Sequence, residues 1–392
     1  MRTLYLHIGH SKTGSSYLQA SFANSLKAMA AQGIDYPGVP SAAASGWQIS
    51  SGNGQRLPID PPEAFTVTGQ KVFFSAEPLF RAFAMERRWT RHLAAFCAHH
   101  DIGQVEVLMF LRDPILHAES TYQQMVKRGG ITEDVDPTFE QYVQPQLVCD
   151  ALDRDFGPVP LRWHVFNYDR NKTALLEIAE RFLGLPAGVL ERGGDPVVNR
   201  SMTAGELMVL RGLNAQDPKA AQALADAWCN EVPDVDSEPA FPSRPIQKAM
   251  LRRQAEAIKE IHTRLDPAQQ YDTTLQRPAR HPERYFFSPR QIEVMGQVLG
   301  ARTGHVTQQM HLERARRLLQ AAQVSFRQGR PGDAELNLTR AKAVLDPLDD
   351  GFDPSIPGLR QGAATLTAKL TAKLAEQAAA AAPDAPPAKS EP

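Results

Sequence analysis

The start of the chain predicts a strand, a loop and a helix in immediate succession. Apolar side chains alternate over residues 4–8, as in a short buried strand. A loop spans residues 9–14, and apolar residues then recur at helical spacing between residues 18 and 29. Such a loop places backbone N–H groups and the positive end of a helix at the edge of a sheet. The opening therefore predicts an α/β fold with a loop at the sheet edge that is suited to an anion.

Strands and helices alternate through the next part of the chain. Further strands are expected at residues 71–75, 105–111 and 161–167, and helices at 78–100, from 114 onward and at 173–183. This order predicts a doubly wound parallel sheet with flanking helices, whose ligands bind beyond the carboxyl ends of the strands. Residues 33–69 are rich in Gly, Pro and Ser without a sustained period, which indicates a long surface excursion.

The rest of the chain has almost wholly helical periodicity. Helices are expected near 203–214, 218–229, 246–264 and 289–300, followed by a helical hairpin broken at Gln328-Gly-Arg-Pro-Gly332. We expect three parts: a main domain over 1–304, a hairpin similar to one tetratricopeptide unit over 305–350, and a helical, low-complexity tail over 351–392 with a disordered end. One helical pair cannot bury its own apolar faces, so the hairpin should dock on the main domain, a protein partner or a second copy.

The composition excludes some classes of partner. Of the 392 residues, 43 are Lys or Arg and 44 are Asp or Glu, so no overall field attracts nucleic acid or an anionic membrane. Three widely spaced cysteines without a CxxC pair suit a reducing compartment. We find neither a signal peptide nor an apolar run of transmembrane length. The expected location is the cytoplasm.

The first group of residues that could bind a ligand or take part in catalysis is Gly9-His-Ser-Lys-Thr-Gly-Ser-Ser16. Its place between strand and helix favours an anion cradle. A nucleotide triphosphatase would need Gly-x4-Gly-Lys-Ser/Thr, whereas here Lys12 precedes Gly14, which is followed by two serines. A glycine loop alone is weak evidence, because many such loops only turn a corner, but Lys, Thr and Ser around it favour phosphate binding.

The second group is Phe110-Leu-Arg-Asp-Pro114, directly after the apolar strand at 105–111. Asp113 and Pro114 suit the N-cap and first position of a helix. Positions 117, 120, 124 and 127 then share one helix face. Arg112 could join His117 and Ser120 in binding a second anion, or the segment could be a capped surface helix with an ordinary ion pair.

The two groups together resemble the donor-binding motifs of sulfotransferases that use PAPS (3′-phosphoadenosine-5′-phosphosulfate). Lys-Thr-Gly-Ser-Ser resembles the 5′-phosphosulfate loop, and Arg-Asp-Pro with a Ser eight residues after the Arg resembles the 3′-phosphate motif. Four further segments are similar to segments of bacterial-type members of this family: Gly33-Ile-Asp-Tyr-Pro37, Ser75-Ala-Glu77, Phe182-Leu-Gly-Leu-Pro186 and Val198-Asn-Arg-Ser201. The resemblance covers roughly residues 3 to 300 and omits the hairpin.

The resemblance implies roles for individual residues. Lys12, Thr13, Gly14, Ser15 and Ser16 would hold the 5′-phosphosulfate of PAPS, and Arg112 and Ser120 its 3′-phosphate. Many members have another Arg where His117 stands, so the share of His117 in phosphate binding stays open. Arg200 could supply a missing positive charge or be an ordinary surface residue.

Sulfuryl transfer needs a cation at the departing phosphate and a base for the acceptor proton. Lys12 suits the first task, and Glu77 suits the second because it follows the strand at 71–75 at the same sheet edge, where similar glycan sulfotransferases also place a Glu. Alternatively, Glu77 only opens the helix at Pro78. His10 is a rival base, or a residue that shapes the loop. No cluster has metal-ligand spacing, so we predict no metal.

Two other functions compete with PAPS-dependent sulfotransferase activity. One is a P-loop kinase or other nucleotide phosphotransferase with Asp113 as its magnesium carboxylate. The other is a non-catalytic scaffold that binds PAP, the desulfated donor product. For an enzyme, the acceptor hydroxyl or amine could belong to a glycan, a lipid headgroup or a small molecule, because acceptor pockets lie in loops that no motif constrains.

Overall fold

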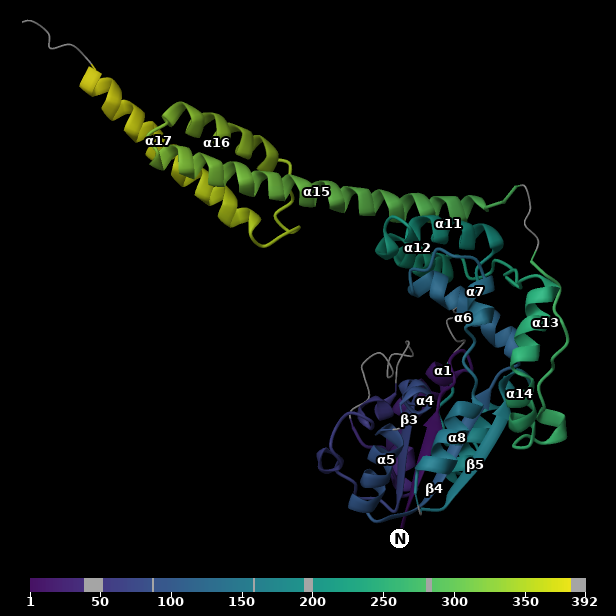
Figure 1. Cartoon of the computed structure of the whole chain (residues 1–392). Helices are drawn as coiled ribbons and strands as arrows, with labels where there is room; N and C mark the ends of the chain where they lie inside the picture. Colours follow the sequence, from purple (N-terminus) through teal and green to yellow (C-terminus); the bar gives the residue numbers. More distant parts are fainter. Residues whose placement is uncertain (39–51, 87, 158, 194–199, 280–283, 382–392) are drawn as a thin grey trace, which may run out of the picture. The chain divides into compact units, whose positions relative to one another are not determined.

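The protein is described by a computed structural model over residues 1–38, 52–86, 88–157, 159–193, 200–279 and 284–381 (Figure 1). The chain divides into two compact units, Met1–Val294 and Met295–Pro392. This division lies N-terminal to the boundary at residue 304 that the sequence suggested.

The first unit is built on a sheet of five parallel strands in the order β2-β3-β1-β4-β5. The strands are β1 (Arg2–Ile8), β2 (Ile34–Asp35), β3 (Lys71–Ala76), β4 (Ile102–Leu111) and β5 (Leu161–Asn167). Strand β1 lies between β3 and β4, so the strands that follow it in the chain are added first on one side of β1 and then on the other. Such a reversal of strand order creates a crevice at the carboxyl end of β1. The parallel α/β sheet predicted from the sequence is confirmed.

The short edge strand β2 was not predicted; it lies at the start of residues 33–69, which the sequence indicated as a long surface excursion. Ile34 and Asp35 pair with Lys71 and Val72 of β3. Two residues are too few to produce a visible alternation, so no sequence period could reveal this strand. Its pairing depends on the buried side chain of Ile34, which packs in the same core as Phe73.

Helices cover both faces of the sheet because side chains alternate along each strand. On one face, strand residues such as Leu4 and Leu6 pack against α4, α5, α8 and α14. On the other, residues such as Phe73 pack against α1, α2 and α10. These helices are α1 (Ser15–Asn24), α2 (Leu26–Ala31), α4 (Pro78–Met85), α5 (Arg88–His99), α8 (Gln146–Asp155), α10 (Leu175–Leu183) and α14 (Ala255–His262).

Several expected helices differ in their limits. The range 78–100 holds two helices, α4 and α5, because Glu86 has an extended backbone after α4. The range 246–264 also holds two, α13 (Arg244–Arg253) and α14. Helix α6 (Pro114–Arg128) follows β4, and α11 and α12 pack beside it. The remaining helices of this unit are α7 (Asp136–Glu140), α9 (Tyr168–Asn171), α11 (Ala204–Asn214) and α12 (Pro218–Glu231).

The second unit contains the greater part of α15 (Pro289–Arg327), together with α16 (Pro331–Leu345) and α17 (Ile356–Ala381). Helix α15 ends and α16 begins around the break at 328–332 that the sequence indicated. Helix α17 packs on both: the shared core contains Leu319, Leu338 and Leu366. The apolar faces of the hairpin are therefore covered in part by a third helix of the same unit. The end of the tail, residues 382–392, for which we expected disorder, lies outside the described residues.

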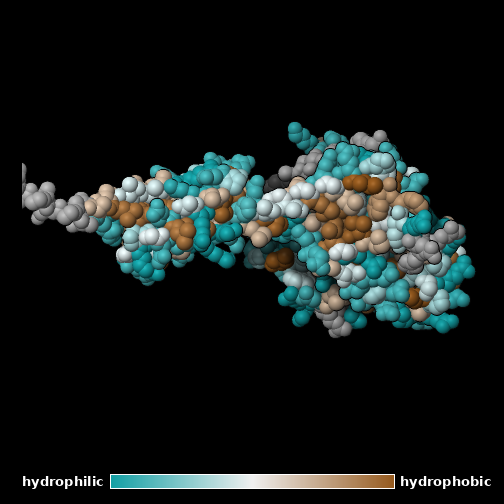
Figure 2. Space-filling view, turned by 90° about the horizontal axis from the view of Figure 1, so that it is seen from above, coloured by the Kyte–Doolittle hydropathy of each residue, from teal (hydrophilic) through white to brown (hydrophobic). Residues whose placement is uncertain are grey.

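The surface of this unit is mixed. Apolar and hydrophilic residues alternate along its helices in the space-filling view (Figure 2). Its exposed large apolar side chains are Val306, Met310, Val324, Leu336 and Leu374. Docking of this unit on a protein partner or a second copy stays a prediction. Within the described ranges of the whole chain, none of the helices combines the length and apolar character that crossing a bilayer requires.

Candidate functional site

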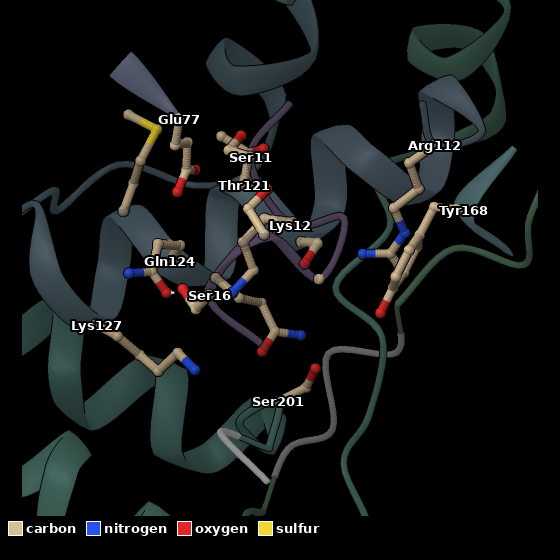
Figure 3. A pocket seen from close by; sticks show the side chains of 15 residues that line it. Ser11, Lys12, Ser16, Glu77, Arg112, Thr121, Gln124, Lys127, Tyr168 and Ser201 are labelled. Carbon is tan, nitrogen blue, oxygen red and sulfur yellow. Dashed lines mark hydrogen bonds between the residues drawn. The ribbon is translucent and has the colours of Figure 1, made fainter. Parts of the chain in front are cut away.

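A cavity of about 540 Å³ opens at the carboxyl edge of the sheet (Figure 3). Four segments that follow strands contribute to it: the loop after β1, Glu77 after β3, Arg112 after β4 and Tyr168 after β5. Parallel strands end at one edge, which explains why residues far apart in the sequence meet here. The cavity is lined by Ser11, Lys12, Gly14, Ser15, Ser16, Glu77, Arg112, Ser120, Thr121, Gln123, Gln124, Met125, Lys127, Tyr168 and Ser201.

The loop after β1 has left-handed backbone at two residues. Lys12 has φ +62° and Gly14 has φ +79°. The left-handed backbone at Gly14 favours glycine, and a Cβ atom there would lie 2.7 Å from Leu175 Cδ1, so the Leu175 side chain would have to shift. The left-handed conformation of Lys12 costs on the order of 1 kcal/mol, a kind of strain that concentrates at ligand sites. The loop brings the start of α1, which has no side-chain cap, to the cavity, where the N–H groups of its first turn suit an anion.

Buried contacts behind the loop hold its shape. The hydroxyl of Thr13 donates to the carbonyl oxygen of His10, and Nε2 of His117 donates to that of Ser11 at 2.9 Å. The His10 ring stacks between Phe80 and His117, with centroid distances of 4.6 and 3.8 Å. Burial lowers the pKa of His10 well below its usual value and that of His117 to about 3, so both rings are neutral. Thr13, His10 and His117 thus shape the loop from behind and do not line the cavity.

Lys12 lies near the middle of the cavity in Figure 3. Its Nζ donates to Oε1 of Gln124 on α6 at 3.3 Å. Burial lowers the pKa of Lys12, the nearby Arg112 guanidinium lowers it further, and the Glu77 carboxylate opposes both effects. The lysine is therefore a partly desolvated cation, which a bound anion would stabilise.

Glu77 points into the cavity from the end of β3 (Figure 3). It occupies the N-cap position of α4, but its side chain makes no capping hydrogen bond. The alternative that Glu77 opens that helix, where a carboxylate favours the helix dipole, needs no such bond and stays a prediction. Burial raises the pKa of Glu77, and Lys12 lowers it in part. Among the described residues that line the cavity, Glu77 is the only carboxylate.

Arg112 lies on the other side of the cavity (Figure 3). Its Nε donates to Oδ1 of Asp169 at 3.2 Å, and its guanidinium carbon lies 5.8 Å from the centre of the Tyr168 ring. Asp169 also pairs with Lys172 at 3.0 Å, so one carboxylate is shared between two cations. Ser120, on the first half of α6, lines the cavity as well. The structure therefore brings Arg112 and Ser120 to the same cavity as the loop.

Two residues considered for the site lie elsewhere. Oδ1 of Asp113 accepts hydrogen bonds from Asn167 Nδ2 at 2.9 Å and from the backbone N–H of Asp272 at 3.0 Å. Asp113 is 5% exposed, does not cap α6 through its side chain and is not part of the cavity lining. Arg200 is also 5% exposed and pairs with Glu206 at 2.6 Å, so it is neither a surface residue nor a cation of the cavity.

Sequence reasoning left several lining residues unassigned. Gln124 and Lys127 share the face of α6 that carries Ser120, so helical spacing was a usable signal for them. Tyr168 directly follows β5, and its place after a parallel strand was a second signal. Ser201 belongs to a segment quoted for the resemblance, but nothing in the sequence indicated that it reaches the cavity.

The charges of the cavity suit an anionic ligand. Of the described residues that line it, Lys12, Arg112 and Lys127 are cationic and Glu77 alone carries a carboxylate. In the part of the chain that the structure describes, no group of three or more His, Cys, Asp or Glu side chains is placed to hold a metal ion. Comparison of the sequence with protein family models and with curated proteins gave no match, and comparison of the structure with solved structures gave none either. The cavity and its residues are therefore the basis for the proposed function.

Proposed function

We propose that this protein is a sulfotransferase that moves the sulfuryl group of PAPS to a hydroxyl or amine of an acceptor. The observation that carries the proposal is the meeting of three elements in one cavity: the loop with Lys12, the Arg112–Ser120 segment and Glu77. The two segments that resemble the 5′ and 3′ motifs of the donor site are about a hundred residues apart in sequence, yet both line the same cavity. The loop would act as the P-loop-like element of a doubly wound fold.

The proposed donor site divides between these segments. The 5′-phosphosulfate would lie against Lys12, Gly14, Ser15 and Ser16, at the start of α1. The 3′-phosphate would bind Arg112 and Ser120, since the Arg112 guanidinium is held in place by Asp169. Thr13 would contribute only its backbone, because its hydroxyl is engaged with the His10 carbonyl.

In the proposed reaction the acceptor oxygen attacks the sulfur in line with the bridging oxygen of PAPS. The new bond forms between acceptor oxygen and sulfur, and the bond between sulfur and the bridging oxygen breaks. PAP leaves with the added negative charge, which Lys12 stabilises. The proton of the acceptor goes to Glu77, whose raised pKa makes it a better base than an exposed glutamate. His10 is less suited to this role because it is buried behind the loop.

The geometry favours this function over a magnesium-dependent kinase. A kinase of the kind considered would need Asp113 at the phosphates, but both hydrogen bonds described for Asp113 go to Asn167 and Asp272, outside the cavity. A non-catalytic scaffold that binds PAP would have no use for a partly desolvated carboxylate beside Lys12. No separate observation favours either alternative.

Thermal denaturation with nucleotides tests the proposal. PAP should raise the melting temperature, because a ligand that binds only the folded state stabilises it. ATP with magnesium is the matched control and should have a much smaller effect. PAPS-dependent transfer to a panel of glycans, lipid headgroups and small metabolites then distinguishes an enzyme from a scaffold. If millimolar PAP leaves the melting temperature unchanged while ATP with magnesium raises it, the proposal is wrong.

A further inference from the structure

Lys127 is a cation of the cavity to which neither donor motif assigns a role. It lies on α6 on the same face as Ser120 and Gln124, seven residues after Ser120. At 1.5 Å per residue, this places the Lys127 backbone roughly 10 Å further along the helix than that of Ser120. In Figure 3, Lys127 and Arg112 lie on opposite sides of the cavity. Lys127 is thus remote from the proposed 3′-phosphate site.

Lys127 has three cationic neighbours, of which two are paired with carboxylates: Arg200 with Glu206 and Arg128 with Asp226. Its Nζ donates to the carbonyl oxygen of Arg200 at 3.1 Å, and the residue is only 4% exposed. The titratable groups that act on it are Lys12 from the loop, Arg128 on α6, Arg200 before α11 and Cys229 on α12. Burial lowers the pKa of Lys127 to about 8; Cys229 opposes this effect, and Lys12, Arg128 and Arg200 add to it. An anion in this part of the cavity would favour the charged form of Lys127.

The donor would neutralise Lys12 and Arg112 but not the far end of the cavity. Glu77, the proposed base, lies on the same side of the view as Lys127, with Gln124 between them (Figure 3). Ser201 also lines the cavity, below Lys12 in Figure 3, and its hydroxyl can donate a hydrogen bond. A molecule whose hydroxyl lies at Glu77 would therefore extend toward Lys127.

We infer that the acceptor is an anionic hydroxyl compound whose carboxylate, sulfate or phosphate group binds Lys127 while its reacting hydroxyl lies at Glu77. This inference rests on the proposed sulfotransferase function and narrows its acceptor class. A neutral acceptor would give the Lys127 ammonium no ion pair in addition to its bond to the Arg200 carbonyl oxygen, so it should be a poorer substrate.

Inorganic sulfate is the probe for this subsite. It is titrated by calorimetry into protein saturated with PAP, with chloride adjusted to keep ionic strength constant. We expect sulfate to bind the parent complex and Lys127→Met to weaken this binding by roughly 10- to 100-fold, the usual worth of a hydrogen bond to a charged group. Lys127→Arg should restore much of the affinity. Lys248→Met is the matched control, since it removes the same charge from an exposed position outside the cavity.

The pH dependence separates an anion site from a merely structural lysine. Lys127 loses its proton as the pH rises through about 8, so sulfate affinity of the parent should fall between pH 7 and 9, whereas Lys127→Arg should show no such fall. PAP affinity is measured for every variant, because retained PAP binding shows that the variant is folded and that its donor site is intact. Equal sulfate binding by Lys127→Met and the parent, or no sulfate binding to the PAP complex, would overturn this inference alone. Absence of PAP binding in the parent would overturn the proposed function, and this inference with it.

Discussion

Two glutamates of the first unit, one buried and one half-buried, have pKa values that are shifted in opposite directions. Glu206 is 0% exposed; burial alone would raise its pKa, but hydrogen bonds from Arg200, the Thr203 backbone and Gln291 lower it below the usual value. Glu77 is half-buried at the cavity, and its pKa is raised because burial outweighs the charge of Lys12. Among the described residues, no group donates a hydrogen bond to Glu77.

The difference shows which buried charges serve the fold. The Arg200–Glu206 pair is satisfied within the protein: Arg200 also donates to the carbonyl oxygens of Val232 and Ser201. Such a pair holds α11 to the preceding loop and has little capacity left for a ligand. The Glu77 carboxylate keeps its capacity to accept hydrogen bonds, so it can accept one, and then the proton itself, from a bound substrate.

The largest effect should come from Glu77→Gln, which keeps the size and removes the basicity. If Glu77 is the base, single-turnover sulfate transfer should fall by ~10²–10⁴ while PAP affinity is retained. Transfer by the parent should also decline as the pH falls through the raised pKa of Glu77, because a protonated carboxyl cannot accept the acceptor proton. The control is His10→Ala, which should weaken PAP binding modestly. Near-parental transfer by Glu77→Gln, with transfer lost in His10→Ala at intact PAP affinity, would assign the base to His10.

The corresponding substitution in the Arg200–Glu206 pair is Glu206→Gln, which should lower the free energy of unfolding. Removing one charge leaves Arg200 buried without its partner, at a cost of about 3–5 kcal/mol in the free energy of unfolding. The parent should likewise lose the contribution of Glu206 as the pH falls through its lowered folded-state pKa. Urea unfolding followed by circular dichroism measures both effects.

The double variant Arg200→Met with Glu206→Leu is the control for this pair. Because it removes both charges, it should be less destabilised than Glu206→Gln. A Glu206→Gln protein as stable as the parent would show that the Arg200–Glu206 pair does not stabilise the fold, which would remove the contrast with Glu77.

A smaller effect is expected from Arg112→Met. The loss of a charge-assisted hydrogen bond to the 3′-phosphate should weaken PAP binding by roughly 10- to 100-fold, with little change in unfolding free energy. Arg170→Met is the matched control, because Arg170 is exposed, donates to the Gln270 carbonyl and does not line the cavity. Equal loss of affinity in both variants, measured by calorimetry, would mean that general charge and not the position of Arg112 decides donor binding.

Local signals predicted the elements well wherever a pattern was long enough. The strands at 71–75, 105–111 and 161–167 and the break near residue 330 are where periodicity and glycine placed them. The two-residue strand β2 was missed because it has no period of its own. The third helix of the second unit was expected only as a tail, since composition does not show what a helix packs against.

The sequence by itself determined the parallel α/β architecture and the loop at the carboxyl end of the first strand, because these follow from alternation, glycine placement and strand order along the chain. Only the tertiary structure decided the direction of side chains. It turned Thr13, Asp113 and His117 away from the cavity and directed Glu77 and Lys127 into it. The physical reason is that a buried polar group turns toward whichever partner lies within hydrogen-bonding distance, and those partners come from segments far apart in the sequence.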